Sequence, residues 1–115
     1  MAVTADRQVN IQYSGTGLNA NNSFPAAQNT SSPAQNSYTN LSSGANTINT
    51  PTGAVSVTIV PPSGNTVSIT LKGISGDTGI RIHNTDPSSI AIDSSVTSFV
   101  LTAANPITGV RILWS

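Results

Sequence analysis

The stretch that decides the fold is AVSVTIVPPSGNTVSITLK, residues 54–72, in which two alternating runs flank a turn of proline, serine, glycine and asparagine. In the first run, Val55, Val57 and Ile59 alternate with serine and threonine, and the second run repeats this pattern over residues 66–72. Such alternation places the apolar side chains on one face of a β-strand. We therefore expect two strands joined as a hairpin through PPSGN.

Further strand signals follow at short intervals. The segments GIRIH (79–83), SIAID (89–93), VTSFVL (96–101) and GVRILWS (109–115) are rich in β-branched residues, and the turn clusters NTDPS and AANPITG lie between them. Helix-favouring residues are scarce, because the chain has no glutamate and one methionine. The pattern predicts an all-β fold, a small antiparallel β-sandwich or jelly-roll-like barrel over residues 51–115.

The first fifty residues have a different character. QVNIQY, residues 8–13, alternates apolar and polar residues and predicts a short strand. From Ser14 to Thr50, large apolar residues are too sparse to build a core, yet the segment lacks the charge of a self-repelling tail. We interpret residues 1–50 as an extended N-terminal arm that orders on a partner. A flexible linker or terminus is the alternative.

Charge and cysteine content exclude several classes of protein. Four basic and four acidic residues give a formal net charge of zero, and no Asp, Glu, Lys or Arg occurs between Gln8 and Leu71. Nucleic acid is therefore not an expected partner, because its phosphates bind clusters of Lys and Arg. There is no cysteine, so disulfides cannot stabilise the fold. No stretch reaches the roughly 18 apolar residues of a membrane span, and the N-terminus does not resemble a signal peptide. We expect a soluble protein with no membrane partner.

The most charged stretch is LKGISGDTGIRIHN, residues 71–84. Its three glycines suggest a phosphate-binding loop, but the Lys-Ser/Thr pair and the following helix of such a loop are missing. Asp77, Asp86 and Asp93 lie in three different turns without the spacing of a calcium loop. We expect these aspartates to cap turns.

The sequence offers little material for catalysis. His83 is the only histidine, so without cysteine it cannot complete a common zinc site, and no spacing marks a Ser-His-Asp arrangement. We expect no enzyme activity, no catalytic residue, no cofactor and no metal.

Two arginines are candidates for contact with a partner. Arg81 alternates with Ile80 and Ile82, which predicts that Arg81 lies on the outer face of its strand in solvent or at an interface. Arg111 lies between Val110 and Ile112 and either solvates an edge or pairs with an aspartate of its own chain, Asp93, or of a neighbouring subunit.

Trp114 is a third candidate. A terminal strand that ends in RILW is expected to bury its tryptophan in the core. The alternatives are a platform on which a glycan stacks and an interface anchor.

Association is the expected role. A core built from residues 51–115 leaves a margin of about a few kcal/mol at best, so the protein is expected to form a homo-oligomer. Large apolar residues in a polar arm require a pocket on a partner, and on this ground Phe24, Tyr38 and Leu41 are the predicted anchors.

The sequence from Asn46 to Ser115 resembles the small, cysteine-free β proteins, rich in Ser, Thr and Asn, of tailed-bacteriophage virions. Such proteins decorate capsid shells or join fibre and tail parts. Capsid-decoration proteins are often trimers, so the resemblance favours a trimer as the homo-oligomer. The resemblance implies a decoration or cement protein on the outer surface of a virion, bound to the major capsid protein through uncharged contacts and the arm. A fibre- or tail-associated protein, or a carbohydrate- or receptor-binding β module, is the alternative.

Overall fold

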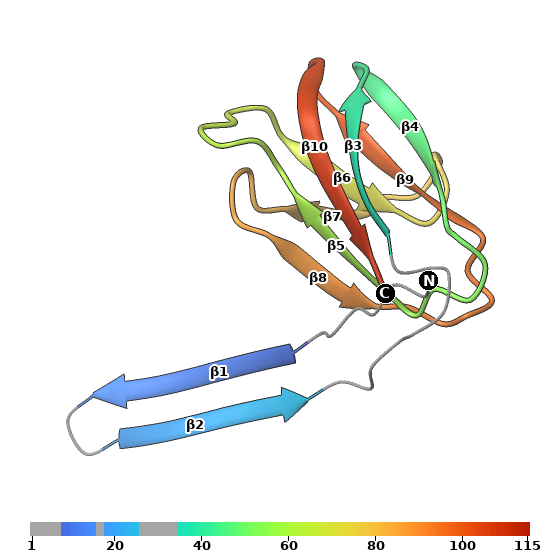
Figure 1. The fold of residues 1–115 in the computed structure, drawn as a ribbon. Coiled ribbons are helices and arrows are strands. Elements are labelled where there is room, and N and C mark those ends of the chain that lie inside the picture. Colours follow the sequence, from blue (N-terminus) through green and yellow to red (C-terminus); the bar gives the residue numbers. More distant parts are fainter. Residues whose placement is uncertain (1–7, 16–17, 26–34) are drawn as a thin grey trace.

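The computed structural model describes the backbone of residues 8–15, 18–25 and 35–115 and the side chains of residues 37–115. Over these residues all regular elements are β-strands. Eight strands form two four-stranded antiparallel sheets that pack face to face (Figure 1). The expected all-β sandwich is confirmed.

Each sheet combines strands from the beginning and the end of the sandwich. The first sheet consists, in spatial order, of β3 (Gln35–Leu41), β10 (Ile107–Trp114), β5 (Ser56–Val60) and β8 (Ser88–Ala91). The second consists of β4 (Gly44–Asn49), β9 (Ser98–Ala103), β6 (Ile69–Lys72) and β7 (Ile80–Ile82). Counted along the chain from β3, the orders are 1-8-3-6 and 2-7-4-5, which is the arrangement of a jelly roll.

The expected hairpin over residues 54–72 is wrong, although both strands exist. β5 pairs with β10 and β8, whereas β6 pairs with β9 and β7 in the other sheet. Two prolines follow β5 directly, and Asn65 then fixes the crossing loop: its side-chain amide donates to the carbonyl oxygens of Val67 at 2.9 Å and Asn84 at 2.8 Å. The loop therefore carries the chain from one sheet to the other.

The boundary expected at residue 51 also differs from the structure. β3 and β4 lie within the expected arm, but they pair with β10 and β9 as edge strands of the two sheets. An edge strand needs few apolar residues, because it has one neighbouring strand and one face on the core. Leu41 and Ile48 supply these contacts, and the sandwich therefore begins at Gln35.

The core lies between the two sheets and is built from alternate residues of their strands. Phe99 of β9 and Trp114 of β10 meet across the sheets, with ring centroids 5.8 Å apart. Trp114 is 5% exposed, which confirms its predicted burial. The buried cluster comprises Leu41, Ala54, Val57, Ile59, Ile69, Ile82, Phe99, Leu101, Ala103, Ile107, Val110, Ile112 and Trp114.

A separate hairpin precedes the sandwich. β1 (Gln8–Gly15), which contains the strand expected over 8–13, pairs antiparallel with β2 (Leu18–Pro25), and neither pairs with a strand of the sandwich (Figure 1). The register of this hairpin runs from the pair Gln8–Pro25 to the pair Gly15–Leu18.

Candidate binding surface

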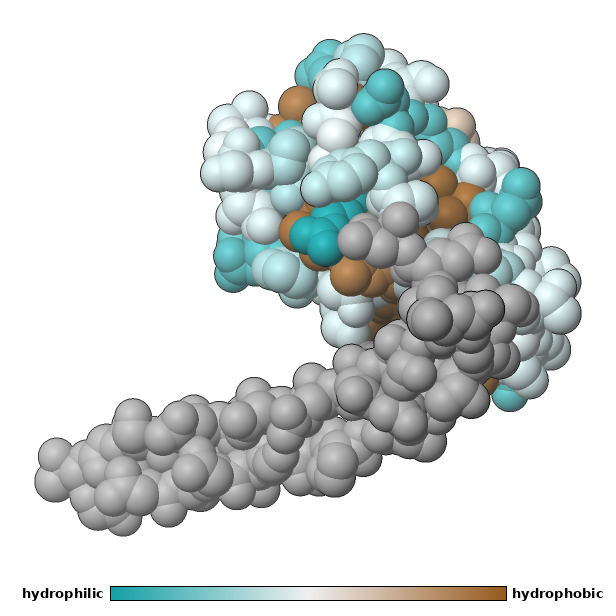
Figure 2. All heavy atoms as spheres, viewed as in Figure 1, coloured by the Kyte–Doolittle hydropathy of each residue, from teal (hydrophilic) through white to brown (hydrophobic). Residues whose placement is uncertain are grey.

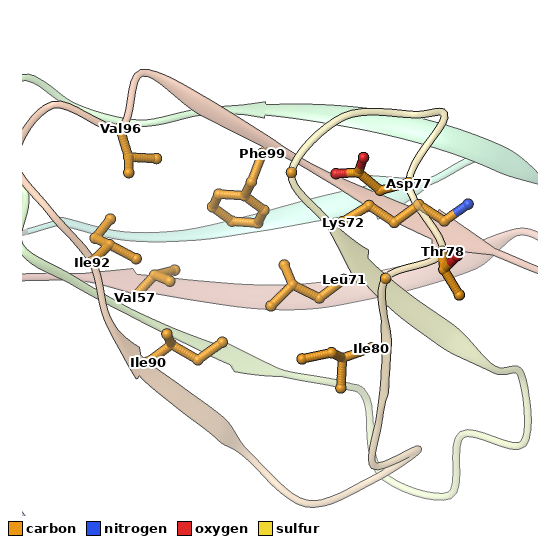
Figure 3. Close-up of a pocket in the computed structure, with 12 residues that line it drawn as sticks. Val57, Leu71, Lys72, Asp77, Thr78, Ile80, Ile90, Ile92, Val96 and Phe99 are labelled. Carbon is orange, nitrogen blue, oxygen red and sulfur yellow. The ribbon is translucent and has the colours of Figure 1, made fainter.

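An apolar pocket of about 590 Å³ opens at the edge of the sandwich where β7 and β8 lie. Both sheets contribute to it: Figure 3 shows Val57 and Ile90 of the first sheet facing Leu71 and Phe99 of the second. The other residues that line it are Lys72, Gly73, Asp77, Thr78, Gly79, Ile80, Ile92 and Val96.

The pocket exists because the inner face of the second sheet extends past the cover that the first sheet provides. Ile80 pairs directly with Leu71, so both lie on the face that carries the core. Yet Ile80 is 71% exposed and Leu71 is only partly buried. Ile80 therefore lies on the inner side of its sheet, at the mouth of the pocket, without being buried.

The rim of the pocket is the glycine-containing turn between β6 and β7. The Asp77 carboxylate accepts a hydrogen bond from the Ile74 backbone N–H at 3.0 Å, and the Asp77 N–H donates to the Ile74 carbonyl oxygen at 3.2 Å. Gly79 has a φ of 74°, a left-handed conformation that glycine adopts without strain. Asp77 therefore caps a turn, as expected. The same turn carries Ile74, whose side chain is 66% exposed.

The charged end of the same stretch lies on the other side of the second sheet. Arg81 and His83 are exposed and line a polar hollow of about 630 Å³ with Asn65, Asn84 and Thr85, together with buried Ile82. His83 Nδ1 accepts a hydrogen bond from the Asp86 backbone N–H at 2.9 Å and lies 3.9 Å from the Asp86 carboxylate. His83 thus holds the turn before β8.

The other two aspartates, Asp86 and Asp93, lie in two different turns. Among the residues that the structure describes, no group of three or more His, Cys, Asp or Glu side chains forms a possible metal site. Asp93 accepts hydrogen bonds from the Ser95 side chain and from the Ser95 backbone N–H, the latter at 2.9 Å, and these bonds lower the pKa of Asp93 below its ordinary 3.8.

The five residues predicted to contact a partner lie in different environments. Leu41 is 2% exposed in the core, so it is not free to anchor on a partner, contrary to the prediction. Tyr38 is 71% exposed on the outer face of the first sheet, and the Arg111 guanidinium carbon lies 6.0 Å from the centre of its ring. Arg81 is exposed, and the side chain of Phe24 lies outside the described residues.

Sequence reasoning missed the pocket and its rim. Ile74 carried one usable signal, because a large apolar residue inside a turn of Gly, Ser and Asp has no strand position from which to reach the core.

The surface of the sandwich is mostly polar on the face that Figure 2 shows. Most residues there have intermediate or hydrophilic character, and hydrophobic residues appear as smaller patches between them.

Comparisons with known proteins do not assign the chain to a family. It matches no protein-family model, no curated protein and no solved structure. Among the described residues, no helix has the length and apolar character needed to cross a membrane.

Proposed function

We propose that this protein is a structural component of a virion, a decoration or cement protein that self-associates and binds a larger protein shell. The observation that carries the proposal is the incomplete edge of the sandwich. Apolar residues on the inner face, Leu71 and Ile80, remain accessible there. An apolar surface that the chain does not cover itself is a typical site of contact with another protein.

The fold and the surface support the same role. Eight-stranded jelly rolls occur in viral capsid proteins, although they also occur in lectins and other proteins, so the fold supports this class only by analogy. Four basic and four acidic residues in 115 leave little surface charge, which suits a protein that remains docked through uncharged contacts. The sequence resemblance to small virion proteins points the same way.

The carbohydrate-binding alternative has less support. Trp114 and Phe99 are buried in the core, which removes Trp114 as a stacking platform. Tyr38 is the exposed aromatic residue among those whose side chains the structure describes. A single tyrosine beside an arginine fits a protein contact as well as a sugar, since both residues are enriched at protein interfaces.

Two measurements on the purified full-length protein test the proposal. Light scattering is expected to give a mass that is a small multiple of 11.7 kDa, with three copies favoured. Co-sedimentation with shells assembled from candidate major capsid proteins is expected to recover the protein with the shells. A strict monomer that sediments with no shell would reject the proposal, and binding to tails or fibres instead would move the protein to that part of a virion.

A further inference from the structure

The polar hollow on the outer side of the second sheet holds a cation that the fold itself does not use. Arg81 lies in β7, and His83 follows this strand two positions later. Both side chains are exposed and line the same hollow of about 630 Å³. Among the residues whose side chains the structure describes, none forms an ion pair or a hydrogen bond with the Arg81 guanidinium. Its N–H groups therefore remain available to an acceptor from outside the sandwich.

The turn after β7 determines which ring nitrogen of His83 donates. Nδ1 accepts hydrogen bonds from the backbone N–H groups of Thr85 at 3.2 Å and Asp86 at 2.9 Å. A neutral imidazole has one acceptor nitrogen and one N–H, so Nε2 carries the hydrogen in this ring. The Nε2–H is thus the donor that His83 has left once its turn is formed.

The rest of the hollow is polar and carries no negative charge. The Asn65 side-chain amide is held by its hydrogen bonds to the carbonyl oxygens of Val67 and Asn84. None of the described residues that line the hollow is acidic. The carboxylate of Asp86 lies 3.9 Å from Nδ1 of His83, which is the ring nitrogen engaged with the turn. The hollow therefore combines a cation and a neutral donor without a carboxylate in its lining.

We propose that this hollow binds a carboxylate, with the Arg81 guanidinium donating to its two oxygens and the Nε2–H of His83 donating to one of them. This inference goes beyond the proposed function and does not depend on it. The planar guanidinium matches the two oxygens of a carboxylate, and such charge-assisted hydrogen bonds are roughly twice as strong as those between neutral groups. An acidic sugar and an acidic amino-acid side chain both carry this group.

Titration of the ¹⁵N-labelled full-length protein with acetate at constant ionic strength tests the proposal. The expected result is a saturable shift of the backbone amide signals of residues 81–85. Arg81→Gln is expected to weaken acetate binding about tenfold, because it removes hydrogen bonds between charged groups. Arg111→Gln is the matched control, since it removes an arginine from β10 in the other sheet. No saturable shift in the parent, or equal acetate affinity in Arg81→Gln and the parent, overturns the proposal.

His83→Asn separates ligand binding from support of the turn. The asparagine Oδ1 replaces Nδ1 as the acceptor for the two backbone N–H groups, whereas the Nε2–H donor is lost. Acetate binding is expected to weaken several-fold while the urea unfolding midpoint stays unchanged. A lower midpoint with unchanged acetate affinity would show that His83 only supports the turn, and it would contradict the role of His83 in binding.

Two further ligands distinguish the sources of the carboxylate. N-acetylneuraminic acid represents an acidic sugar, and N-acetylglutamic acid α-amide represents an acidic side chain. Tighter binding of one of them than of acetate identifies the source, and equal affinity for all three supports recognition of the carboxylate alone. Their methyl esters lack the negative charge and are expected not to bind, so esters that bind as tightly as the acids overturn the proposal.

The outcomes separate this inference from the proposed function. A protein that is monomeric in light scattering and binds acetate through Arg81 rejects self-association and supports the carboxylate site. An oligomer that does not bind acetate overturns the carboxylate site alone.

Discussion

Single residues determine the shape of the pocket rim. Gly79 brings the chain back beside β6 so closely that an added methyl group would lie 2.5 Å from the carbonyl oxygen of Leu71. Asp77 ties the other side of the turn through its hydrogen bond with Ile74. Asp77 and Gly79 therefore both stabilise the conformation of this turn.

Gly79→Ala is expected to destabilise the protein by about 1–3 kcal/mol, because alanine is strained at a φ of 74° and its methyl group meets backbone. The urea midpoint measures this effect. Gly76→Ala is the matched control, since a methyl group there meets nothing within 4 Å. Equal midpoints for the two variants would show that the rim does not hold this conformation.

Asp93 gives a prediction about pH. Hydrogen bonds from the Ser95 side chain and backbone N–H lower the pKa of Asp93 in the folded protein. The ionised carboxylate therefore stabilises the fold at pH values above the ordinary pKa of 3.8. This contribution is lost as the pH falls through the lower folded-state pKa. Asp93→Asn is thus expected to be less stable than the parent at pH 7, with the difference shrinking in acid. Denaturant unfolding of the parent and the variant at pH 7 and in acid measures this difference in stability. A difference that grows in acid contradicts the prediction.

Individual strands show why polar sequence can belong to a sandwich. β3 and β4 occupy edges, so each has one hydrogen-bonded neighbour and contributes few side chains to the core. Asn46 supplements the packing at the start of β4, where its side-chain amide donates to the Leu101 carbonyl oxygen of β9 at 3.0 Å. Hydrogen bonds thus hold an edge that composition alone assigns to an arm.

Leu41→Ala is expected to cost about 2–5 kcal/mol of stability, because it leaves a cavity in the core. Tyr38→Ala, three residues earlier on the same strand, is expected to change stability by about 0.5 kcal/mol or less, since Tyr38 is 71% exposed. Urea unfolding compares the two. Similar small losses in both variants would argue that β3 is not part of the folded sandwich.

Asn65→Ala is expected to lower stability by about 1–3 kcal/mol. The side chain donates to Val67 and Asn84 and accepts from the Val67 N–H at 3.1 Å, and the substitution leaves these groups without that partner. Thermal unfolding is the measurement. Asn105→Ala, in an exposed turn, provides the comparison, and equal effects of the two would discount the role of Asn65 in the crossing loop.

At the scale of the whole molecule, the near absence of charge has a measurable consequence. Contacts made by apolar side chains and backbone are not screened by salt, unlike contacts between exposed charges. The oligomer mass is therefore expected to be unchanged or higher when NaCl rises from about 0.05 M to about 1 M, a range that shortens the screening length several-fold. Light scattering across this range tests the expectation, and dissociation at high salt would point to an interface of paired charges.

The sequence by itself determined the all-β class, the position of most strands after residue 54 and the burial of Trp114. These features depend on local alternation and on turn residues, which can be read over a few neighbouring positions. Val57 and Ile59 in β5, or Val110 and Ile112 in β10, needed no distant partner to show which face they present.

Only the tertiary structure decided which strands are neighbours. Local alternation at residues 54–72 is the same whether β5 and β6 form a hairpin or lie in opposite sheets, since pairing depends on β8, β9 and β10 far along the chain. The exposure of Ile80 and the burial of Leu41 were also decided by the tertiary structure alone. Each depends on what lies opposite the residue in the facing sheet, which the pattern along its own strand does not encode.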